Sequence, residues 1–538
     1  MYPLHRLAAL LRLYSTIHLL LILPFSLLAQ KYDANWLFGR IYQSHSTTYP
    51  YYGTTDVSYN YTPAQLNFSN RPANFVGYMY NFSNAAGTMQ TYSNGVKIFN
   101  RLNQIMENGD SINCCGYLFN TSYSSNTPSG VEDGDGYRGI GGMTALLQPN
   151  TDSILHIFYS RHNPISHPNY VSYPGELLHT IIDLSKNNGL GKVIQKNKNI
   201  QLAGTQLNSA SVTACRHANG RDYWILTQDL YKCYYYKYLL TDKGLVYKGW
   251  QQPDPWYSNA LFYDTQSQTI FNTEGDKLAN FDIEVGVRIY DFDRCTGDLR
   301  LKHTIPPDPA RPNGGLAFSP NSRFLYYSNL TYLYQIDMQD NSIDTVGVYD
   351  GFFYSIPGFP TSKYRTNFFS AYTAPDGKIY VNTYDLFTRY LHTIESPNLK
   401  GMACNFQQHS VFLPTFNYTT TPNYVNYRLG PLIGSGCDTL YSATQSAAAP
   451  QKSYDTQLFP NPASSNSRLV WYEPLREAAK VQVVNAIGQV VQSTAVNTTD
   501  TYLDMDIKNL PNGVYSVRLQ PQGASAARYQ VASLAVMR

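Results

Sequence analysis

A repeated pair of short β-strands around a tight turn is the feature that most constrains the fold of this 538-residue chain. Each copy has a strand of small and apolar residues, a polar turn, and an alternating strand rich in Tyr, Ile and Val. The copies cover residues 144–160, 213–228, 316–329 and 370–383, with a weaker one at 261–272. The turns of the four strong copies contain residues that reverse a chain at low cost: Pro149–Asn150, Asn219–Gly220, Pro320–Asn321 and Asp376–Gly377.

Most copies are followed by a second strand–turn–strand unit, such as "YYYKYLLTDKGLVYKG" after residue 233. The turn residues are separated by 69, 47, 55 and 55 positions along the series Asn150, Asn219, Gln266, Asn321 and Asp376. Two hairpins in about 50 residues, repeated, match the four-stranded blades of a β-propeller. We therefore predict an all-β fold with a six- or seven-bladed propeller, six fitting the count best. A pair of β-sandwiches is the alternative, but its turns would recur more densely.

Two further segments are predicted to be strands that close the ring. They are "NWLFGRIY" (35–42) and "NYVNYRLG" (423–430). We expect them to complete one shared blade, because closure removes the exposed edges of the sheets.

The composition agrees with this fold and excludes some partners. The chain has 48 Tyr, and aromatic residues make up 14% of it; Tyr and Thr suit the half-buried surface of a strand. Charged residues are also 14% and the net charge is +3. This balance provides no basic surface for nucleic acid.

The N-terminus is predicted to be a signal peptide over residues 1–29. His5, Arg6 and Arg12 come before the apolar run "IHLLLILPFSLLAQ", and cleavage is expected after Ala29. A buried first helix is the alternative interpretation. No later stretch approaches the ~20 apolar residues that cross a bilayer, so we expect an exported mature chain without a transmembrane segment.

The cysteines and one acidic loop give weaker indications. Seven cysteines are too few for a disulfide scaffold, and Cys215 and Cys233 are the predicted pair because they fall on what look like neighbouring strands. The loop "VEDGDGYRG" could hold Ca²⁺ through Asp133 and Asp135, although it lacks the EF-hand spacing and a solvated turn explains it more simply. No other cofactor is expected.

The chain changes character after the low-complexity run "SATQSAAAPQ" (442–451). We predict a propeller over 30–440, a flexible linker over 441–457, and a small Ig-like β-sandwich over 458–538. The last segment contains three ordered motifs, namely "PNP", then "VQVVNAIGQVV", then "LPNGVYSVRL".

These motifs resemble the type A sorting domain of the type IX secretion system. The resemblance assigns the sorting motif to Pro460, Asn461, Pro462, Gly488, Asn512 and Gly513. It implies that the domain interacts with an outer-membrane translocon, that it is usually removed afterwards, and that the protein is secreted or displayed on the cell surface. An Ig-like stabilising or glycan-binding module is the alternative.

The larger region is similar to the propeller found in many exported proteins of bacteria with this system. The similarity lies in "GELLHTIIDLSKNNGLGKV" followed by "SASVTACRHANGRDYWILTQD". In the second segment, Arg216, His217 and Asp222 could be an acid–base cluster, but we favour a blade turn held by polar side chains.

No nucleophile motif, phosphate-binding loop or zinc-ligand spacing occurs in the chain, so no catalytic residue is assigned. The favoured function is binding of a glycan or a protein, and Tyr-rich stretches such as 48–53 and 231–238 suit such contacts. The alternative is a propeller hydrolase or lyase acting on extracellular polysaccharide, whose carboxylates would converge only in the fold.

Overall fold

The computed structural model describes most of the chain outside the N-terminal 29 residues. The described residues are 30–40, 51–75, 77–113, 142–163, 173–200, 207, 212–229, 233–254, 267–283, 285–308, 314–385, 387–417, 423–438, 456–471, 475, 478–485, 489–521 and 529–537. The chain forms two compact units, Met1–Ile433 and Gly434–Arg538.

The described part of the larger unit contains seven antiparallel sheets of three or four strands that follow one another along the chain, and one two-stranded sheet. The first two have three strands each: β1 (Asn35–Arg40), β2 (Gly53–Ser58) and β3 (Gln65–Ser69), then β4 (Tyr80–Ser83), β5 (Met89–Ser93) and β6 (Ile98–Asn100). The next two have four strands each: β7 (Met143–Leu147), β8 (Ile154–Asn163), β9 (Tyr173–Asp183) and β10 (Lys192–Asn199), then β11 (Thr213–Arg216), β12 (Tyr223–Gln228), β13 (Tyr235–Thr241) and β14 (Gly244–Gln251).

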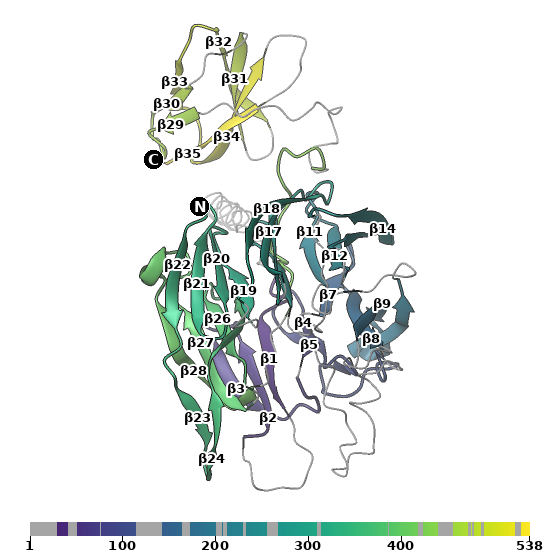
Figure 1. Cartoon of the computed structure of the whole chain (residues 1–538). Helices are drawn as coiled ribbons and strands as arrows, with labels where there is room; N and C mark the ends of the chain where they lie inside the picture. Colours follow the sequence, from purple (N-terminus) through teal and green to yellow (C-terminus); the bar gives the residue numbers. More distant parts are fainter. Residues whose placement is uncertain are drawn as a thin grey trace, which may run out of the picture. The chain divides into compact units, whose positions relative to one another are not determined.

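Three more four-stranded sheets complete the series. They are β15 (Gln268–Phe271), β16 (Lys277–Asp282), β17 (Gly286–Phe292) and β18 (Leu299–Ile305), then β19 (Gly315–Phe318), β20 (Phe324–Ser328), β21 (Tyr332–Asp337) and β22 (Ile343–Val348), and finally β25 (Phe368–Thr373), β26 (Ile379–Thr383), β27 (Thr388–Ile394) and β28 (Phe406–Asn417). The hairpin β23 (Phe353–Ile356) and β24 (Phe359–Arg365) is inserted before β25 and extends past the ends of β22 and β28 (Figure 1). Two short helical turns, α3 (Lys186–Gly189) and η1 (Gly401–Cys404), lie between strands.

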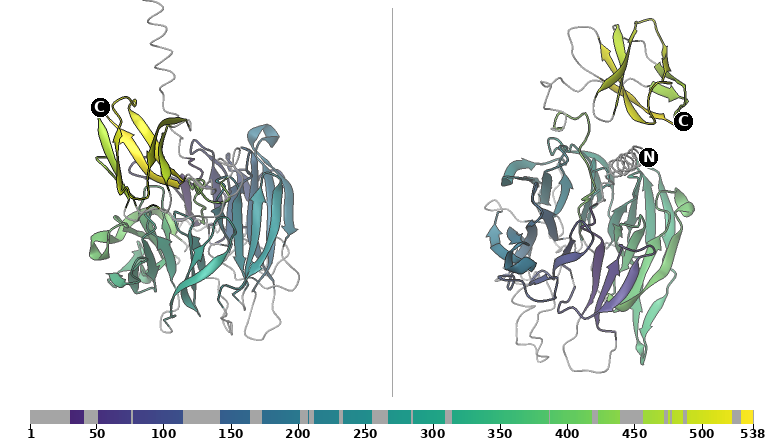
Figure 2. Two further views of the ribbon diagram at one scale, coloured as in Figure 1. Left: turned by 90° about the horizontal axis from the view of Figure 1, so that it is seen from above. Right: turned by 180° about the vertical axis from the view of Figure 1, so that it is seen from behind.

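The seven sheets form a closed ring. The first strand of each sheet contacts the first strand of the next, from β1 to β4 and onward to β25, and β28 contacts β1 and β2. Figures 1 and 2 show the sheets standing side by side in this order. The larger unit is therefore a β-propeller, as predicted, with seven sheets where six fitted the sequence best.

Burial along the strands explains why the sequence forms blades. Strand β19, the first of its sheet, is buried at all four positions. Strand β18, the last of the preceding sheet, alternates between exposed positions and positions that are buried or half-buried. A short apolar run suits a strand covered on both faces, and alternation suits an outer strand with one wet face.

The prediction that residues 423–430 form a strand is wrong. The segment Asn423–Leu432, which we call the strap, has no strand and crosses several sheets instead. The Tyr427 hydroxyl donates to Ala145 O in β7 (2.6 Å), the Tyr424 hydroxyl donates to Asn35 O in β1 (2.6 Å), and the Arg428 guanidinium binds the Asp33 carboxylate (2.6 and 2.7 Å). The strap joins distant sheets through side chains, a role that periodicity cannot reveal.

The turn between β11 and β12 shows how closely the strap packs. Gly220 has a φ of 70°, and a Cβ at this position would lie 2.6 Å from the backbone nitrogen of Pro431. Ala218 O also accepts a hydrogen bond from Leu432 N (2.8 Å). The Asn219–Gly220 turn therefore needs glycine both for its conformation and for the approach of the strap.

The smaller unit has two antiparallel sheets that share an apolar core. One sheet contains β29 (Thr456–Phe459), β30 (Asn466–Trp471) and β33 (Tyr502–Asp506); the other contains β31 (Ala479–Val484), β32 (Val490–Val496), β34 (Gly513–Pro521) and β35 (Tyr529–Val536). Leu469, Val481, Val517 and Leu534 are among the buried side chains between them. This arrangement confirms the predicted small β-sandwich.

The predicted Cys215–Cys233 disulfide is wrong, because both residues are buried free thiols. Cys215 lies in β11, and Cys233 precedes β13, so β12 separates them. Two strand spacings amount to about 10 Å, which exceeds the Cα separation that a disulfide spans. The disulfide-bonded cysteines among the described residues include Cys295 and Cys437.

Candidate functional site

A cleft of about 310 Å³ lies where the first and last sheets of the ring meet. One wall comes from β1, β2, β3 and the β2–β3 turn, and the other from β26, β27, β28 and the β25–β26 turn. The lining residues are Phe38, Val57, Tyr59, Tyr61, Thr62, Pro63, Ala64, Leu66, Asp376, Lys378, Tyr380, Leu391 and Val411. Its volume is at the small end of the range of about 300–1,000 Å³ typical of ligand pockets.

Three tyrosine rings line the cleft together with apolar side chains. The rings of Tyr59 and Tyr380 lie with centroids 6.0 Å apart at an interplanar angle of 76°. The buried Trp36 indole packs behind them, 5.1 Å from Tyr59 and 5.7 Å from Tyr380. The third ring, Tyr61, is 54% exposed at the edge of the cleft. Burial raises the pKa of Tyr59 and Tyr380 well above the usual value, so both remain neutral phenols.

The β25–β26 turn places a carboxylate beside these rings. Gly377 has a φ of 81°, and the Asp376 carboxylate accepts a hydrogen bond from Lys378 N (3.1 Å), which fixes the turn. The other oxygen of the Asp376 carboxylate accepts a hydrogen bond from the Tyr380 hydroxyl (2.8 Å). This is one of the turns that the sequence predicts from Asp-Gly.

The ammonium group of Lys378 is already paired. Its Nζ lies 2.6 Å from a carboxylate oxygen of Glu395, at the end of β27. With Lys378 and Glu395 compensating each other, Asp376 leaves one net negative charge at this side of the cleft. The cleft therefore combines aromatic faces with a partly exposed anion.

The polar turn "RHANGRD" is confirmed as a structural element. The backbone N–H of Asn219 donates to His217 Nδ1 (3.0 Å), and the Asn219 amide donates to the Asp222 carboxylate (2.8 Å). Arg216 donates to Gly220 O (2.8 Å) and to Tyr427 O of the strap (3.1 Å). These side chains are used to hold the turn and the strap, so no acid–base cluster is assigned here.

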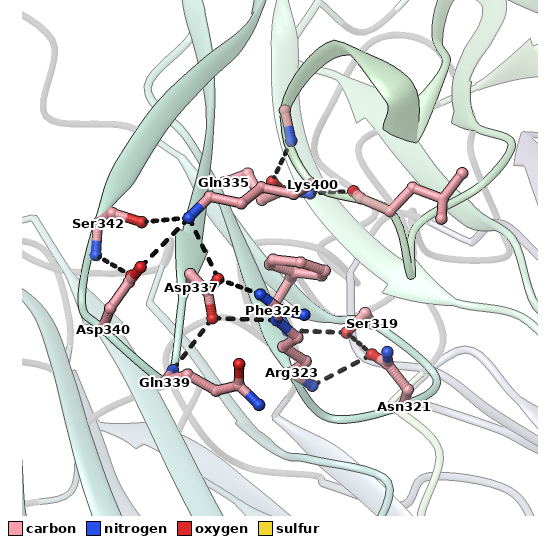
Figure 3. Close-up of polar contacts among 12 residues, drawn as sticks. Ser319, Asn321, Arg323, Phe324, Gln335, Asp337, Gln339, Asp340, Ser342 and Lys400 are labelled. Atoms are coloured by element: carbon pink, nitrogen blue, oxygen red, sulfur yellow. Dashed lines mark hydrogen bonds and ion pairs between the residues drawn. The ribbon is translucent and has the colours of Figure 1, made fainter.

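A second polar cluster, on β20–β22, is also structural (Figure 3). Asp337 contacts both Arg323 (2.8 Å) and Lys400 (3.4 Å), and Lys400 also contacts Asp340 (3.3 Å). The hydrogen bond from Arg323 lowers the pKa of Asp337, and those from Ser342 lower the pKa of Asp340 to about 2. Lys400 lies just before η1, so its contacts with Asp337 and Asp340 anchor that segment to the neighbouring sheet. The two cations and two carboxylates of the cluster balance one another.

Of the described tyrosines in the stretch 231–238, Tyr234 is half-buried at the surface and the others are buried. Tyr234 packs against Trp250 of β14 with centroids 4.6 Å apart, and Trp250 is 55% exposed. Tyr236 and Tyr238 of the same stretch are buried. This outer edge of the β11–β14 sheet is a second aromatic surface, which we call the Trp250 surface.

Several predicted sites lie outside the described residues: the signal peptide, the calcium candidates Asp133 and Asp135, and the sorting residue Gly488. Among the residues that the structure describes, no group of three or more His, Cys, Asp or Glu side chains could hold a metal. Nor does any described helix have the length and apolarity to cross a membrane.

The other sorting residues lie at the ends of strands in the smaller unit. Pro460 and Pro462 follow β29, and Asn461 Oδ1 accepts a hydrogen bond from Ala535 N of β35 (2.8 Å). Asn512 and Gly513 lead into β34. These positions show where the residues lie, while their role in recognition stays a prediction.

Comparison with known proteins identifies the smaller unit. Residues 457–531 match the family described as the secretion system C-terminal sorting domain. The predicted recognition is therefore confirmed: the chain is an exported β-propeller protein with a C-terminal sorting domain. It is a cargo of the type IX secretion system, delivered to the cell surface or the extracellular space. No curated protein matches the chain.

Solved structures with some similarity include two lactonases and a propeller domain. A candidate 6-phosphogluconolactonase of Bacteroides fragilis is 13% identical, with 71% of this chain and 97% of that chain covered and a TM-score of 0.42. The periplasmic gluconolactonase of Pseudomonas aeruginosa is 12% identical, with coverages of 70% and 96% and a TM-score of 0.34. The Cps50 (Swd1) propeller domain of Myceliophthora thermophila is 9% identical, with coverages of 58% and 94% and a TM-score of 0.29. Because all three scores are below 0.5, the propeller assignment rests on the ring of sheets.

Proposed function

We propose that this cargo binds a glycan at the cell surface or outside the cell, in the cleft between the first and last sheets. The observation that carries the proposal is the set of three tyrosine rings with one carboxylate in a concave site of about 310 Å³. Tyrosine offers a rigid apolar face with a polar tip, which suits the C–H face and the hydroxyl groups of a sugar ring.

We also propose the domain limits that the sequence suggests, with a propeller over 30–440 and a linker over 441–457. In this arrangement the propeller is the functional part, and residues 458–538 serve export. A linker of small and polar residues would suit a peptidase that separates the two.

Binding of the full-length chain to a glycan array tests the proposal. Tyr61→Ala should abolish or strongly weaken any signal, because it removes the exposed ring of the cleft. Tyr502→Ala is the matched control: Tyr502 is 51% exposed against 54% for Tyr61, but it lies in the sorting domain. Binding that persists in Tyr61→Ala and disappears in Trp250→Ala would move the ligand to the Trp250 surface and contradict the proposed cleft.

The alternative, a hydrolase or lyase acting on extracellular polysaccharide, predicts product release in the same experiment. Asp376 is the one carboxylate among the residues that line the cleft, whereas glycoside hydrolysis usually needs a pair. The described lining therefore favours binding. Degradation of a bound polysaccharide by wild type, lost in Asp376→Asn, would instead support the enzyme.

A further inference from the structure

The electrostatics of the cleft suggest which kind of sugar it accepts. Its wall carries the Asp376 carboxylate, and the nearby Lys378 ammonium is held by Glu395 at 2.6 Å. A uronic acid or a sulfated sugar would bring an anion next to Asp376, and the described lining of the cleft offers it no free cation. The charge of the site is thus complementary to a cation.

The aromatic walls favour the same kind of ligand. Tyr59 and Tyr380 meet nearly at a right angle, at 76° and with centroids 6.0 Å apart, and Tyr61 stands at the edge. The face of an aromatic ring carries a negative potential, so a tyrosine face that lines the cleft attracts an ammonium group. The hydrogen bond from the Tyr380 hydroxyl to Asp376 (2.8 Å) places the carboxylate at the edge of this wall.

From these two observations we propose that the cleft recognises a sugar unit that carries a protonated amine, with the ammonium beside the Asp376 carboxylate and against a tyrosine ring that lines the cleft. This inference rests on the proposed glycan binding and narrows its ligand class. The Lys378–Glu395 pair then contributes to specificity indirectly. Because Glu395 neutralises the charge of Lys378, the cleft does not attract anionic sugars.

Isothermal titration of the full-length chain with two matched ligands tests the inference. A glucosamine tetramer and its N-acetylated counterpart have the same backbone, but only the first carries ammonium groups below the pKa of its amines. We expect the glucosamine tetramer to bind at least tenfold more tightly, which corresponds to about 1.4 kcal/mol.

Two conservative variants connect this preference to the named residues. Asp376→Asn preserves the acceptor for Lys378 N and removes the charge, so the preference should fall about tenfold. Glu395→Gln releases the Lys378 charge, so it should also weaken the amine ligand and favour a uronate oligomer. Asp152→Asn is the control, because Asp152 is an exposed aspartate in the equivalent first hairpin of another sheet.

The outcomes separate this inference from the proposed function. Equal binding of both tetramers, or a preference that Asp376→Asn leaves intact, would overturn the amine assignment while glycan binding stands. Binding of choline chloride without binding of either tetramer would indicate that the cleft recognises a quaternary ammonium group that is not part of a sugar, and would overturn both proposals. Absence of binding to every glycan tested would overturn the proposed function itself.

Discussion

The strap provides the strongest test of how this propeller is held closed. Tyr427 is buried, and its ring lies 5.3 Å from Tyr32 and 6.2 Å from Phe82 between centroids. Its hydroxyl donates to Ala145 O, a contact between residues 282 positions apart. Tyr427→Phe should cost about 1–3 kcal/mol of unfolding free energy, because the buried carbonyl loses its donor. Tyr427→Ala should cost about 3–5 kcal/mol, because the ring packing is also lost.

Urea unfolding of the full-length protein measures both effects, with tryptophan fluorescence as the signal. Trp36 and Trp224 report on the propeller and Trp471 on the sorting domain. We expect the propeller transition to move to lower urea and the sorting-domain transition to stay in place. An unchanged propeller transition in Tyr427→Ala, equal to that of the exposed-site control Tyr502→Ala, would refute the role of the strap.

Three other predictions follow from buried groups and from the sorting domain. Burial lowers the pKa of His156 to about 4 and of His179 to about 3. Because the unfolded chain takes up their protons near pH 6.5, the free energy of unfolding should fall below that pH by about 1.4 kcal/mol per histidine and pH unit. Equal free energies of unfolding by urea at pH 7.5 and pH 5.5 would contradict this prediction. Burial raises the pKa of the Cys215 and Cys233 thiols to about 12, so a maleimide reagent should label them only in denaturant, and rapid labelling of the native protein would show that they are accessible. Deletion of residues 458–538 should leave the protein in the periplasm, as cell fractionation would show, and normal surface delivery of the truncated chain would argue against the sorting role.

Local features of the fold were predictable from the sequence. Three features depend on residues within a few positions of one another. They are the Asp376–Gly377 turn, the hydrogen-bonded turn around Asn219, and the strands of the terminal module. Turn chemistry and alternation act at this range, so the hairpins, the propeller and the small sandwich all follow from them.

Features that depend on the meeting of distant segments were not predictable in the same way. The Cys215–Cys233 pair looked plausible because both residues fall on what look like neighbouring strands, but the order of strands places β12 between them. The segment "NYVNYRLG" was predicted to be a strand that helps to close the ring. In the structure its tyrosines instead reach carbonyl groups of β1 and β7 across the ring.

The candidate cleft is the clearest case, because it exists only when the ring is closed. Tyr61 and Asp376 are 315 positions apart in the sequence, and no local pattern relates the β2–β3 turn to the β25–β26 turn. The sheets that carry them are the first and the last of the ring, and they are neighbours only in the closed fold. Bringing such distant segments together has an entropic cost that grows with the logarithm of the loop length. The strap helps to offset that cost, since Arg428 pairs with Asp33, just before β1. The closure that stabilises the fold is therefore also what assembles the two walls of the cleft.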